Sequence, residues 1–333
     1  MSLSQIGTDA AGVDATAVPV APQPGMVGRS PGRLAWARLR ANRTAMVSGW
    51  IMLFFIVLGL AAPLIELLYG ISPFEQFQDK IANNSLPLGY FGGVSGEHWF
   101  GLEPQLGRDI FIRLVYGLRT SLFIATSAAL LTTALGIVLG IVSGYLGGWI
   151  DGVISWVIDF ALALPFLIFA LAIMPTVTAR FYGPRDEIPV PFRIGVMIFL
   201  FALFGWTGTA RLVRGQVISL REREFVEAAR ASGAGLFHIL FRQLLPNLWA
   251  PILVSFSLAV PGYITGEAAL SFLGIGVVDP TPDFGVMINK SLSYAQTDPA
   301  YLIFPGVVIF LLVLAFNLFG DGLRDALDPK SSR

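Results

Sequence analysis

Six long apolar segments constrain the fold of this chain more than any other feature of its sequence. Each is close to the roughly 20 residues that an α-helix needs to cross a bilayer. The segments are Met46–Ile65, Leu122–Ser143, Ile150–Met174, Ile194–Leu212, Trp249–Leu273 and Leu302–Leu318. Proline predicts a kink near Pro165 in the third segment, and Gly274–Tyr301, rich in Pro and Gly, is expected to be an outer loop. Only 13% of the 333 residues are charged, whereas soluble domains average about 25%. The sequence therefore predicts an all-α integral membrane protein with six transmembrane helices.

The basic residues before the first segment predict the orientation of the chain. Membrane proteins carry an excess of Lys and Arg on the cytosolic side, so the N-terminus is expected there, and six crossings bring the C-terminus back to it. The predicted divisions are a disordered tail with an amphipathic lead-in (1–45), a first span (46–65), an extracytoplasmic segment (66–121), a five-helix core (122–323) and a cytosolic tail (324–333).

The remaining composition excludes several kinds of site. The 22 basic and 22 acidic residues cancel, so charge does not favour a nucleic-acid partner. There are no cysteines, and His98 and His238 have no metal-ligand spacing; both are expected to be structural or solvated. The sequence contains no G-x-x-x-x-G-K-S/T phosphate loop. We therefore expect no catalytic residue, no metal site and no cofactor bound by this chain.

The loop 219–246, between the fourth and fifth segments, is the longest charged, helix-forming stretch. Ser219 and Glu222 have the spacing of a capping box, which predicts that a helix begins there. This helix is expected to end in a left-handed C-cap at Gly233. A second short helix, Leu236–Leu245, is expected to stop at the proline that follows it.

The first of these two helices has two chemically different faces at helical spacing. One face carries small and apolar residues: Phe225, Ala228, Ala229 and Ser232. The opposite face carries charged residues: Arg223, Glu227 and Arg230. The small alanines would let another surface approach the helix backbone closely.

The spacing of this loop resembles the EAA motif of ABC importer permeases, in which Glu-Ala-Ala is followed by a glycine and then by Leu-Pro. One position departs from the motif, because Gln243 stands where the family has isoleucine. The resemblance implies that the loop is a coupling helix that docks into a groove on a cytosolic ATPase. The residues expected to serve this coupling are Arg223, Glu224, Glu227, Ala228, Ala229, Ser232, Gly233 and Pro246.

Two further phrases are similar to those of the same family. FGLEPQLGRDIFIRLVYGLRTS, at 100–121, resembles a run of the peptide-importer permeases, although Leu102-Glu103 replaces Thr-Asp and Ile112 replaces serine. Its apolar spacing predicts a short helix on the outer surface. The ending FNLFGDGLRDALDP also matches, and it predicts a short amphipathic helix at the membrane exit. Together these motifs resemble the C-type permease subunit of the peptide and nickel branch, which implies a type I ABC importer permease fold.

Glycines recur every four residues in the second segment, at Gly136, Gly140 and Gly144. This small-xxx-small spacing lets transmembrane helices pack closely. Asp159 and Glu267 lie within apolar segments, where an ionisable group is costly and usually faces a bundle interior or an aqueous path. Each is expected either to line or brace a translocation path or to make a structural hydrogen bond. Neither has a basic residue four positions away, so any ionic partner must come from another helix or subunit.

The resemblance implies a bacterial cytoplasmic-membrane permease that imports di- or oligopeptides. Its implied partners are a homologous second permease, one or two cytosolic ATPase subunits that bind ATP and Mg²⁺, and an extracytoplasmic substrate-binding protein. Nickel and glutathione remain alternative substrates. A less favoured alternative is a secondary transporter or channel that uses Asp159 and Glu267 as a proton or cation relay. A purely structural membrane scaffold would leave the cost of these two acidic residues unexplained.

Overall fold

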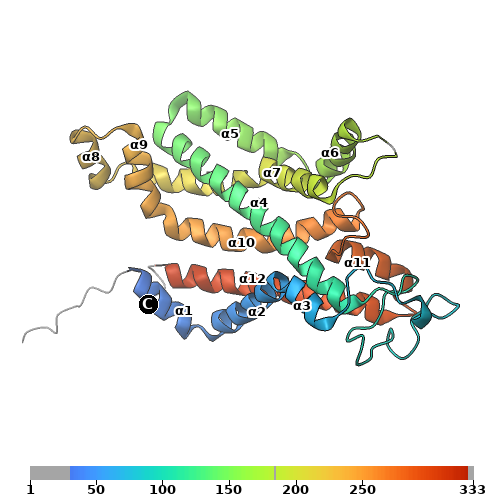
Figure 1. Cartoon of the computed structure of the whole chain (residues 1–333). Coiled ribbons are helices and arrows are strands. Elements are labelled where there is room, and N and C mark those ends of the chain that lie inside the picture. Colours follow the sequence, from blue (N-terminus) through green and yellow to red (C-terminus); the bar gives the residue numbers. More distant parts are fainter. Residues whose placement is uncertain (1–30, 184, 329–333) are drawn as a thin grey trace, which may run out of the picture.

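The computed structural model describes residues 31–183 and 185–328, which are helical except in the connecting segments (Figure 1). Within these residues the only β-structure is two isolated bridges, Ile81 with Pro87 and Leu102 with Asp109. The all-α prediction is therefore confirmed. The disordered tail predicted before residue 31 and the last five residues of the cytosolic tail lie outside the described residues.

The helices are α1 (Pro31–Ala41), α2 (Arg43–Leu60), α3 (Ala62–Tyr69), η1 (Gln78–Lys80), α4 (Ile110–Leu146), α5 (Gly148–Ala163), α6 (Phe166–Phe181), α7 (Val190–Leu220), α8 (Glu224–Ala231), α9 (Leu236–His238), η2 (Ile239–Leu244), α10 (Leu245–Phe272), α11 (Phe284–Ser291), η3 (Leu292–Tyr294) and α12 (Pro299–Leu327). Among the described residues, five helical runs are long and apolar enough to cross a membrane: α2, α4, α7, the run from α9 to α10, and α12. The bent pair of α5 and α6 makes six if it is counted as one span.

The third predicted span is broken rather than gently kinked. Its two halves, α5 and α6, are bent by 86°, and Figure 1 shows the two helices running in clearly different directions. The break is at Leu164 and Pro165, where Leu164 is extended with ψ 125°. Proline has no N–H to donate to the preceding turn, and it disfavours helical backbone at the residue before it. The predicted position of the bend is confirmed, and its angle is larger than a kink.

The short outer helix predicted within 100–121 is not a separate element. Helix α4 runs without interruption from Ile110 to Leu146, 37 residues, which corresponds to about 55 Å. Asp109 caps its start by accepting a hydrogen bond from the Ile112 N–H at 3.1 Å. The predicted apolar face is confirmed, because Ile110, Leu114 and Leu118 are all buried.

Two other helix boundaries differ from the sequence prediction. The helix from Leu236 does not stop at Pro246 but continues to Phe272, because the π-helical turn η2 widens the helix just before the proline and proline is tolerated in a first turn. The segment 274–301, predicted as a loop, contains α11. The amphipathic exit helix predicted at the C-terminus is the last part of α12.

The glycine stripe of α4 lies directly against α7, as its spacing predicts. A Cβ added at Gly136 would lie 2.6 Å from the Thr209 Cβ, and one added at Gly140 would lie 2.6 Å from the Ala210 carbonyl oxygen. A Cβ at Gly144 would lie 2.8 Å from the carbonyl oxygen of Arg214. Only glycine leaves room for the two backbones to approach this closely.

The short helices and the connecting segments lie at two opposite ends of the helix bundle (Figure 1). One end holds α1, the end of α12, and the α8–α9 segment. The other end holds α11 and the connecting segment between α3 and α4. The predicted grouping of the two ends of the chain with the charged loop therefore agrees with the positions of α1 and the end of α12, the first and last described helices.

Candidate functional site

The predicted start of the loop helix is wrong. Ser219 lies in the last turn of α7, which ends at Leu220, and the Arg221 N–H still bonds to the Val217 carbonyl at 2.9 Å. Ser219 is therefore part of the continuous hydrogen bonding of α7 and cannot act as the N-cap of a new helix. Helix α8 begins at Glu224, and its N-cap Arg223 is extended and makes no side-chain cap bond.

Gly233 forms the elbow after α8, as predicted. Its φ is +79°, a left-handed conformation that costs other residues about 1 kcal/mol or more. The Gly233 N–H bonds to the Arg230 carbonyl at 2.9 Å, and the Ala234 N–H bonds to the Ala229 carbonyl at 3.0 Å. This pair of bonds is a Schellman motif. A Cβ on Gly233 would meet nothing within 4 Å, so the backbone conformation, and not space, requires glycine.

One apolar side chain joins α8 to a buried cluster at the ends of three spanning helices. Val226 is 0% exposed and belongs to a buried cluster with side chains of α4, α7, η2 and α10. The other buried members of this cluster are Ile141, Val213, Val217, Ile239, Leu240, Leu244 and Leu248. Sequence reasoning missed Val226, although an apolar β-branched residue between charged neighbours could have indicated an inward-facing position.

A second attachment joins α8 to the end of α4. The Arg230 Nε donates to the Tyr145 Oη at 3.1 Å, and the guanidinium lies 5.0 Å from the centre of the same ring. Arg221 adds a bond from its Nη1 to the Gly144 carbonyl at 3.1 Å. These contacts join residues 77 and 85 positions apart, and no local pattern indicates them.

Most of α8 and its elbow is exposed, including Arg230, although its guanidinium reaches Tyr145. The exposed residues are Arg223, Glu224, Phe225, Glu227, Ala228, Arg230, Ser232 and Gly233. Ala229 is half-buried beside Val226, and the Ser232 hydroxyl bonds back to the Ala228 carbonyl at 2.8 Å. Pro246 is exposed but lies in the first turn of α10. The structure therefore brings seven of the eight predicted coupling residues onto one short projecting element, and Pro246 onto a spanning helix.

Asp159 has an ionic partner on another helix, as its sequence environment required. Its Oδ1 lies 2.7 Å from the Nη2 of Arg211 on α7. The two side chains are 71% and 57% exposed in this chain. The pair therefore lies on the surface of α5 and α7.

Glu267 has the opposite environment, because it is 0% exposed. Its Oε2 accepts a hydrogen bond from Ser121 of α4 at 2.7 Å, and its Oε1 accepts one from Ser271 at 3.0 Å. Asp283, at the start of α11, acts electrostatically on the same carboxyl. Sequence reasoning missed Asp283 because the segment that contains it was expected to be a loop.

A groove of about 980 Å³ opens between α2, α4, α10 and α12. Its lining is mainly apolar, and neither Asp159 nor Glu267 belongs to it. The polar groups that face it come mostly from α4: Tyr116, Arg119, Thr120, Thr126, Ser127 and, from α10, Ser257.

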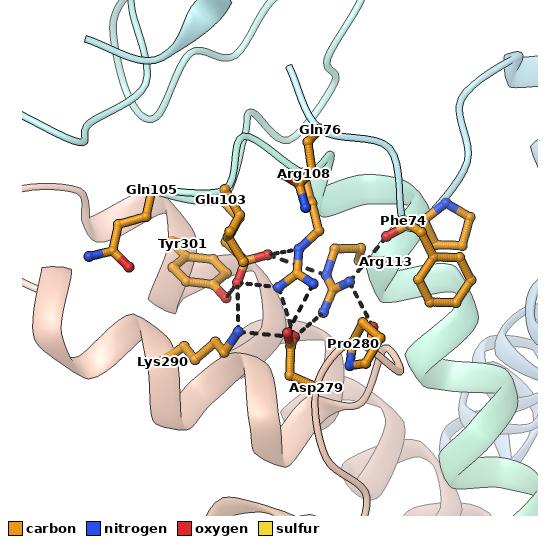
Figure 2. Close-up of polar contacts among 12 residues, drawn as sticks. Phe74, Gln76, Glu103, Gln105, Arg108, Arg113, Asp279, Pro280, Lys290 and Tyr301 are labelled. Atoms are coloured by element: carbon orange, nitrogen blue, oxygen red, sulfur yellow. Dashed lines mark hydrogen bonds and ion pairs between the residues drawn. The ribbon is translucent and has the colours of Figure 1, made fainter. Parts of the chain in front are cut away.

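A buried cluster of charges joins the α3–α4 segment to the α10–α12 segment (Figure 2). Arg108 binds the Glu103 carboxylate through two nitrogens, at 2.7 and 2.9 Å, and binds Asp279 at 2.8 Å. Arg113 lies 3.5 Å from Glu103 and 3.4 Å from Asp279. Lys290 lies 3.0 Å from Asp279. Burial opposes the charge of Arg108, but its bonds to the two carboxylates outweigh burial and raise its pKa.

The two histidines have the structural and solvated roles that were expected. His98 is buried, and its Nδ1 lies 2.8 Å from the Asp109 Oδ2, which also accepts a bond from Tyr69 at 2.9 Å. His238 is exposed, and its Nε2 lies 3.2 Å from the Gln243 side chain.

Comparison with known proteins adds information that the geometry does not contain. Residues 136–333 match the family model of the binding-protein-dependent transport system inner membrane component. Residues 30–87 match the N-terminal transmembrane domain of oligopeptide transport permease C. A solved structure of the MetNI methionine ABC transporter in inward-facing conformations aligns with a TM-score of 0.49 at 17% identity, covering 65% of this chain and 96% of that chain.

Several curated proteins are similar over nearly the whole chain. The dipeptide transport system permease protein DppC of Bacillus subtilis (strain 168) is 38% identical over 90% of this chain and 86% of its own length. The oligopeptide transport system permease protein OppC of the same organism is 35% identical over 89% and 88%. The glutathione transport system permease protein GsiD of Escherichia coli O1:K1 / APEC is 35% identical over 91% of each chain.

Proposed function

This chain belongs to the family of inner membrane components of binding-protein-dependent transport systems, and we propose that it is a permease subunit through which an ATP-driven importer moves di- or oligopeptides across the bacterial cytoplasmic membrane. Support for a peptide substrate comes from the relatives that are named for dipeptide and oligopeptide transport. Glutathione, itself a small peptide, is the alternative with a named relative at similar identity.

In this proposal the chain does not work alone. A homologous second permease completes the path, one or two cytosolic ATPase subunits bind ATP and Mg²⁺, and an extracytoplasmic protein delivers the substrate. This chain contributes the path and the mechanical connection and binds no cofactor of its own. If α8 faces the ATPases, then α1 and the end of α12, which share its end of the bundle (Figure 1), are cytosolic.

The observation that carries the proposal is the construction of α8. Its outer surface is exposed and carries the small residue Ala228, so a partner can approach its backbone. On its inner surface, Val226 belongs to the buried cluster that also contains side chains of η2, α4, α7 and α10. A force applied to α8 therefore reaches three spanning helices through packed side chains. Closure of the ATPases would move these helices as a rigid body between inward-open and outward-open states.

We propose that Asp159 and Glu267 brace the spanning helices. The pair of Asp159 with Arg211 connects α5 to α7. Glu267 connects α10 to α4 and α11 through Ser121 and Asp283. Their placement away from the 980 Å³ groove supports bracing rather than direct contact with substrate.

Gly233→Pro tests the coupling role. Proline fixes φ near −65°, which conflicts with +79°, and it removes the N–H that bonds to Arg230. We expect uptake to fall at least tenfold in membrane vesicles that contain the full importer, while the amount of inserted permease and the ATPase activity of the complex persist. The matched control is Gly235→Pro, because Gly235 already has a φ of −68°. Uptake by Gly233→Pro at the level of this control would overturn the coupling proposal.

A further inference from the structure

Two acidic side chains meet in the interior where α11 packs on α10. Glu267 and Asp283 are each 0% exposed, and their carboxyl groups are close enough to act electrostatically on each other. The surrounding backbone is tightly packed, because a Cβ on Gly285 would lie 2.1 Å from the Ala268 carbonyl oxygen. A Cβ on Gly117 of α4 would lie 3.4 Å from the Asp283 backbone nitrogen. The pair is therefore enclosed by α4, α10 and α11.

The hydrogen-bond donors around this pair do not satisfy all four carboxyl oxygens. Ser121 and Ser271 each donate to one oxygen of Glu267. The Val286 N–H donates to the Asp283 Oδ1 at 3.1 Å, as a helix N-cap. The Asp283 Oδ2 is buried and has no donor. A buried carboxyl oxygen is normally hydrogen-bonded. Because ionised carboxylates can only accept hydrogen bonds, a proton on one of the two carboxyl groups would supply the donor that the Asp283 Oδ2 lacks.

The charges around the pair also indicate that one of the two carboxyl groups is protonated. Each carboxyl group acts on the other. The other groups that act on them are the hydroxyls of Ser121 and Ser271 and the backbone N–H groups of Gly285 and Val286. Within the described residues no Lys, Arg or His forms an ion pair with either acid. Two adjacent buried carboxylates without a cation would each carry a desolvation penalty of several kcal/mol and would also repel each other.

We propose that Glu267 and Asp283 hold a single proton between them, and that this shared proton fixes α11 to α10. The proton gives the Asp283 Oδ2 its missing hydrogen bond and removes one of the two charges. The remaining charge is stabilised by the two serine hydroxyls and by the N-terminal N–H groups of α11, where a helix favours negative charge. Among the described residues no third His, Cys, Asp or Glu joins the pair as a further metal ligand, and this favours a proton over a metal ion, which takes more oxygen ligands than two carboxyl groups supply.

The burial of Asp283 also raises the pKa of its carboxyl above the ordinary range, in agreement with a proton retained at neutral pH. The shared proton gives α11 a second attachment besides the charged cluster around Glu103 and Asp279 (Figure 2). The two attachments differ in chemistry. The cluster around Glu103 and Asp279 uses ion pairs, whereas the pair between α10 and α11 uses a proton in place of a cation.

Infrared spectroscopy of the purified importer tests this proposal independently of transport. At about pH 8 an ordinary carboxyl, with a pKa near 4, is ionised, so the carbonyl stretch of a protonated carboxyl reports the shared proton. We expect this band in the wild type and its loss in Glu267→Gln and in Asp283→Asn. In each variant an amide N–H replaces the shared proton, which leaves the other acid ionised. The control Glu75→Gln, at an exposed carboxyl, leaves the band unchanged.

Three results would overturn the proposal. A wild-type spectrum without the band at pH 8 would mean that both acids are ionised. A band that persists in both variants would belong to another residue. A thermal stability of the wild-type importer that depends on Na⁺ or Ca²⁺ at constant pH would assign the site to a metal ion. The first and third measurements use only the wild type, so they remain decisive if a variant fails to fold.

Discussion

At the scale of single residues, the end of the bundle that holds α11 is organised by a buried carboxylate. Glu103 is 2% exposed and accepts bonds from Arg108 and, at 2.7 Å, from the hydroxyl of Tyr301. A buried ion pair adds little stability compared with apolar packing, but removal of one partner leaves an uncompensated charge. Here three cations, Arg108, Arg113 and Lys290, surround Glu103 and Asp279.

We predict that Glu103→Gln destabilises the chain by about 3–5 kcal/mol, because three cations would then share one carboxylate. The measurement is the heat-denaturation midpoint of the purified importer. The matched control is Glu97→Gln, which also removes an acid paired with a cation, Lys80, but at an exposed position. A midpoint that changes equally little in both variants would show that the buried cluster does not contribute to stability.

The same residue predicts a dependence of stability on pH. Burial acts to raise the pKa of Glu103, but the bond from Arg108 and the charges of Arg113 and Arg108 outweigh it and lower the pKa below 4.5. A carboxyl with a lower pKa in the folded chain contributes stability that is present above pH 4.5 and is lost as pH falls through the folded pKa. The wild type should therefore lose stability on acidification below pH 4.5, and Glu103→Gln should lose less.

The sequence could predict part of this cluster. Arg108 and Arg113 lie in a family-like phrase, and Glu103 stands where that phrase has Thr-Asp. Their partner Asp279 lies 171 positions after Arg108, in a segment that was expected to be an irregular loop. No local spacing indicates a contact between such distant residues, so the motif identified the arginines without showing what they bind.

At the scale of helices, the contact of α4 with α7 depends on the absence of side chains. We predict that Gly140→Ala destabilises the chain by about 1–3 kcal/mol, because the added methyl would overpack the interface against the Ala210 carbonyl and Val213. The control Gly152→Ala adds the same methyl to α5, where a Cβ meets nothing within 4 Å. The difference between their heat-denaturation midpoints measures the close approach, and equal midpoints would contradict it.

The helix boundaries show where local patterns are sufficient and where they are not. The glycine spacing of α4 and the break at Pro165 were predictable, because close packing and the missing proline N–H act locally. The capping box at Ser219 failed because α7 extends through it. The stop at Pro246 failed because the π-helical turn before it joins the loop to α10. In both cases the hydrogen bonding of an adjacent spanning helix continued through the residues whose local pattern predicted a helix boundary.

At the scale of the whole molecule, α8 has two surfaces that our proposal separates by function. Phe225 lies on the outer surface and is exposed, and its neighbour Val226 is buried among the ends of α4, α7 and α10. The outer surface is expected to bind the ATPase. The inner surface is expected to pass the movement of the ATPase to the spanning helices. The two roles are separable because adjacent residues on a helix point about 100° apart.

We predict that substitutions at these two neighbours fail in different ways. Val226→Ala loosens the anchor of α8, so the ATPases should still co-purify with the permease while substrate imported per ATP hydrolysed falls several-fold. Phe225→Ala removes contact area from the exposed surface, so the ATPases should co-purify less and dissociate faster, while the import that remains stays coupled. Quantitative co-purification and paired uptake and ATPase assays in vesicles separate the two outcomes. If both variants lost ATPase binding to the same extent, α8 would act only as a docking surface, and the rigid connection through Val226 would not transmit movement.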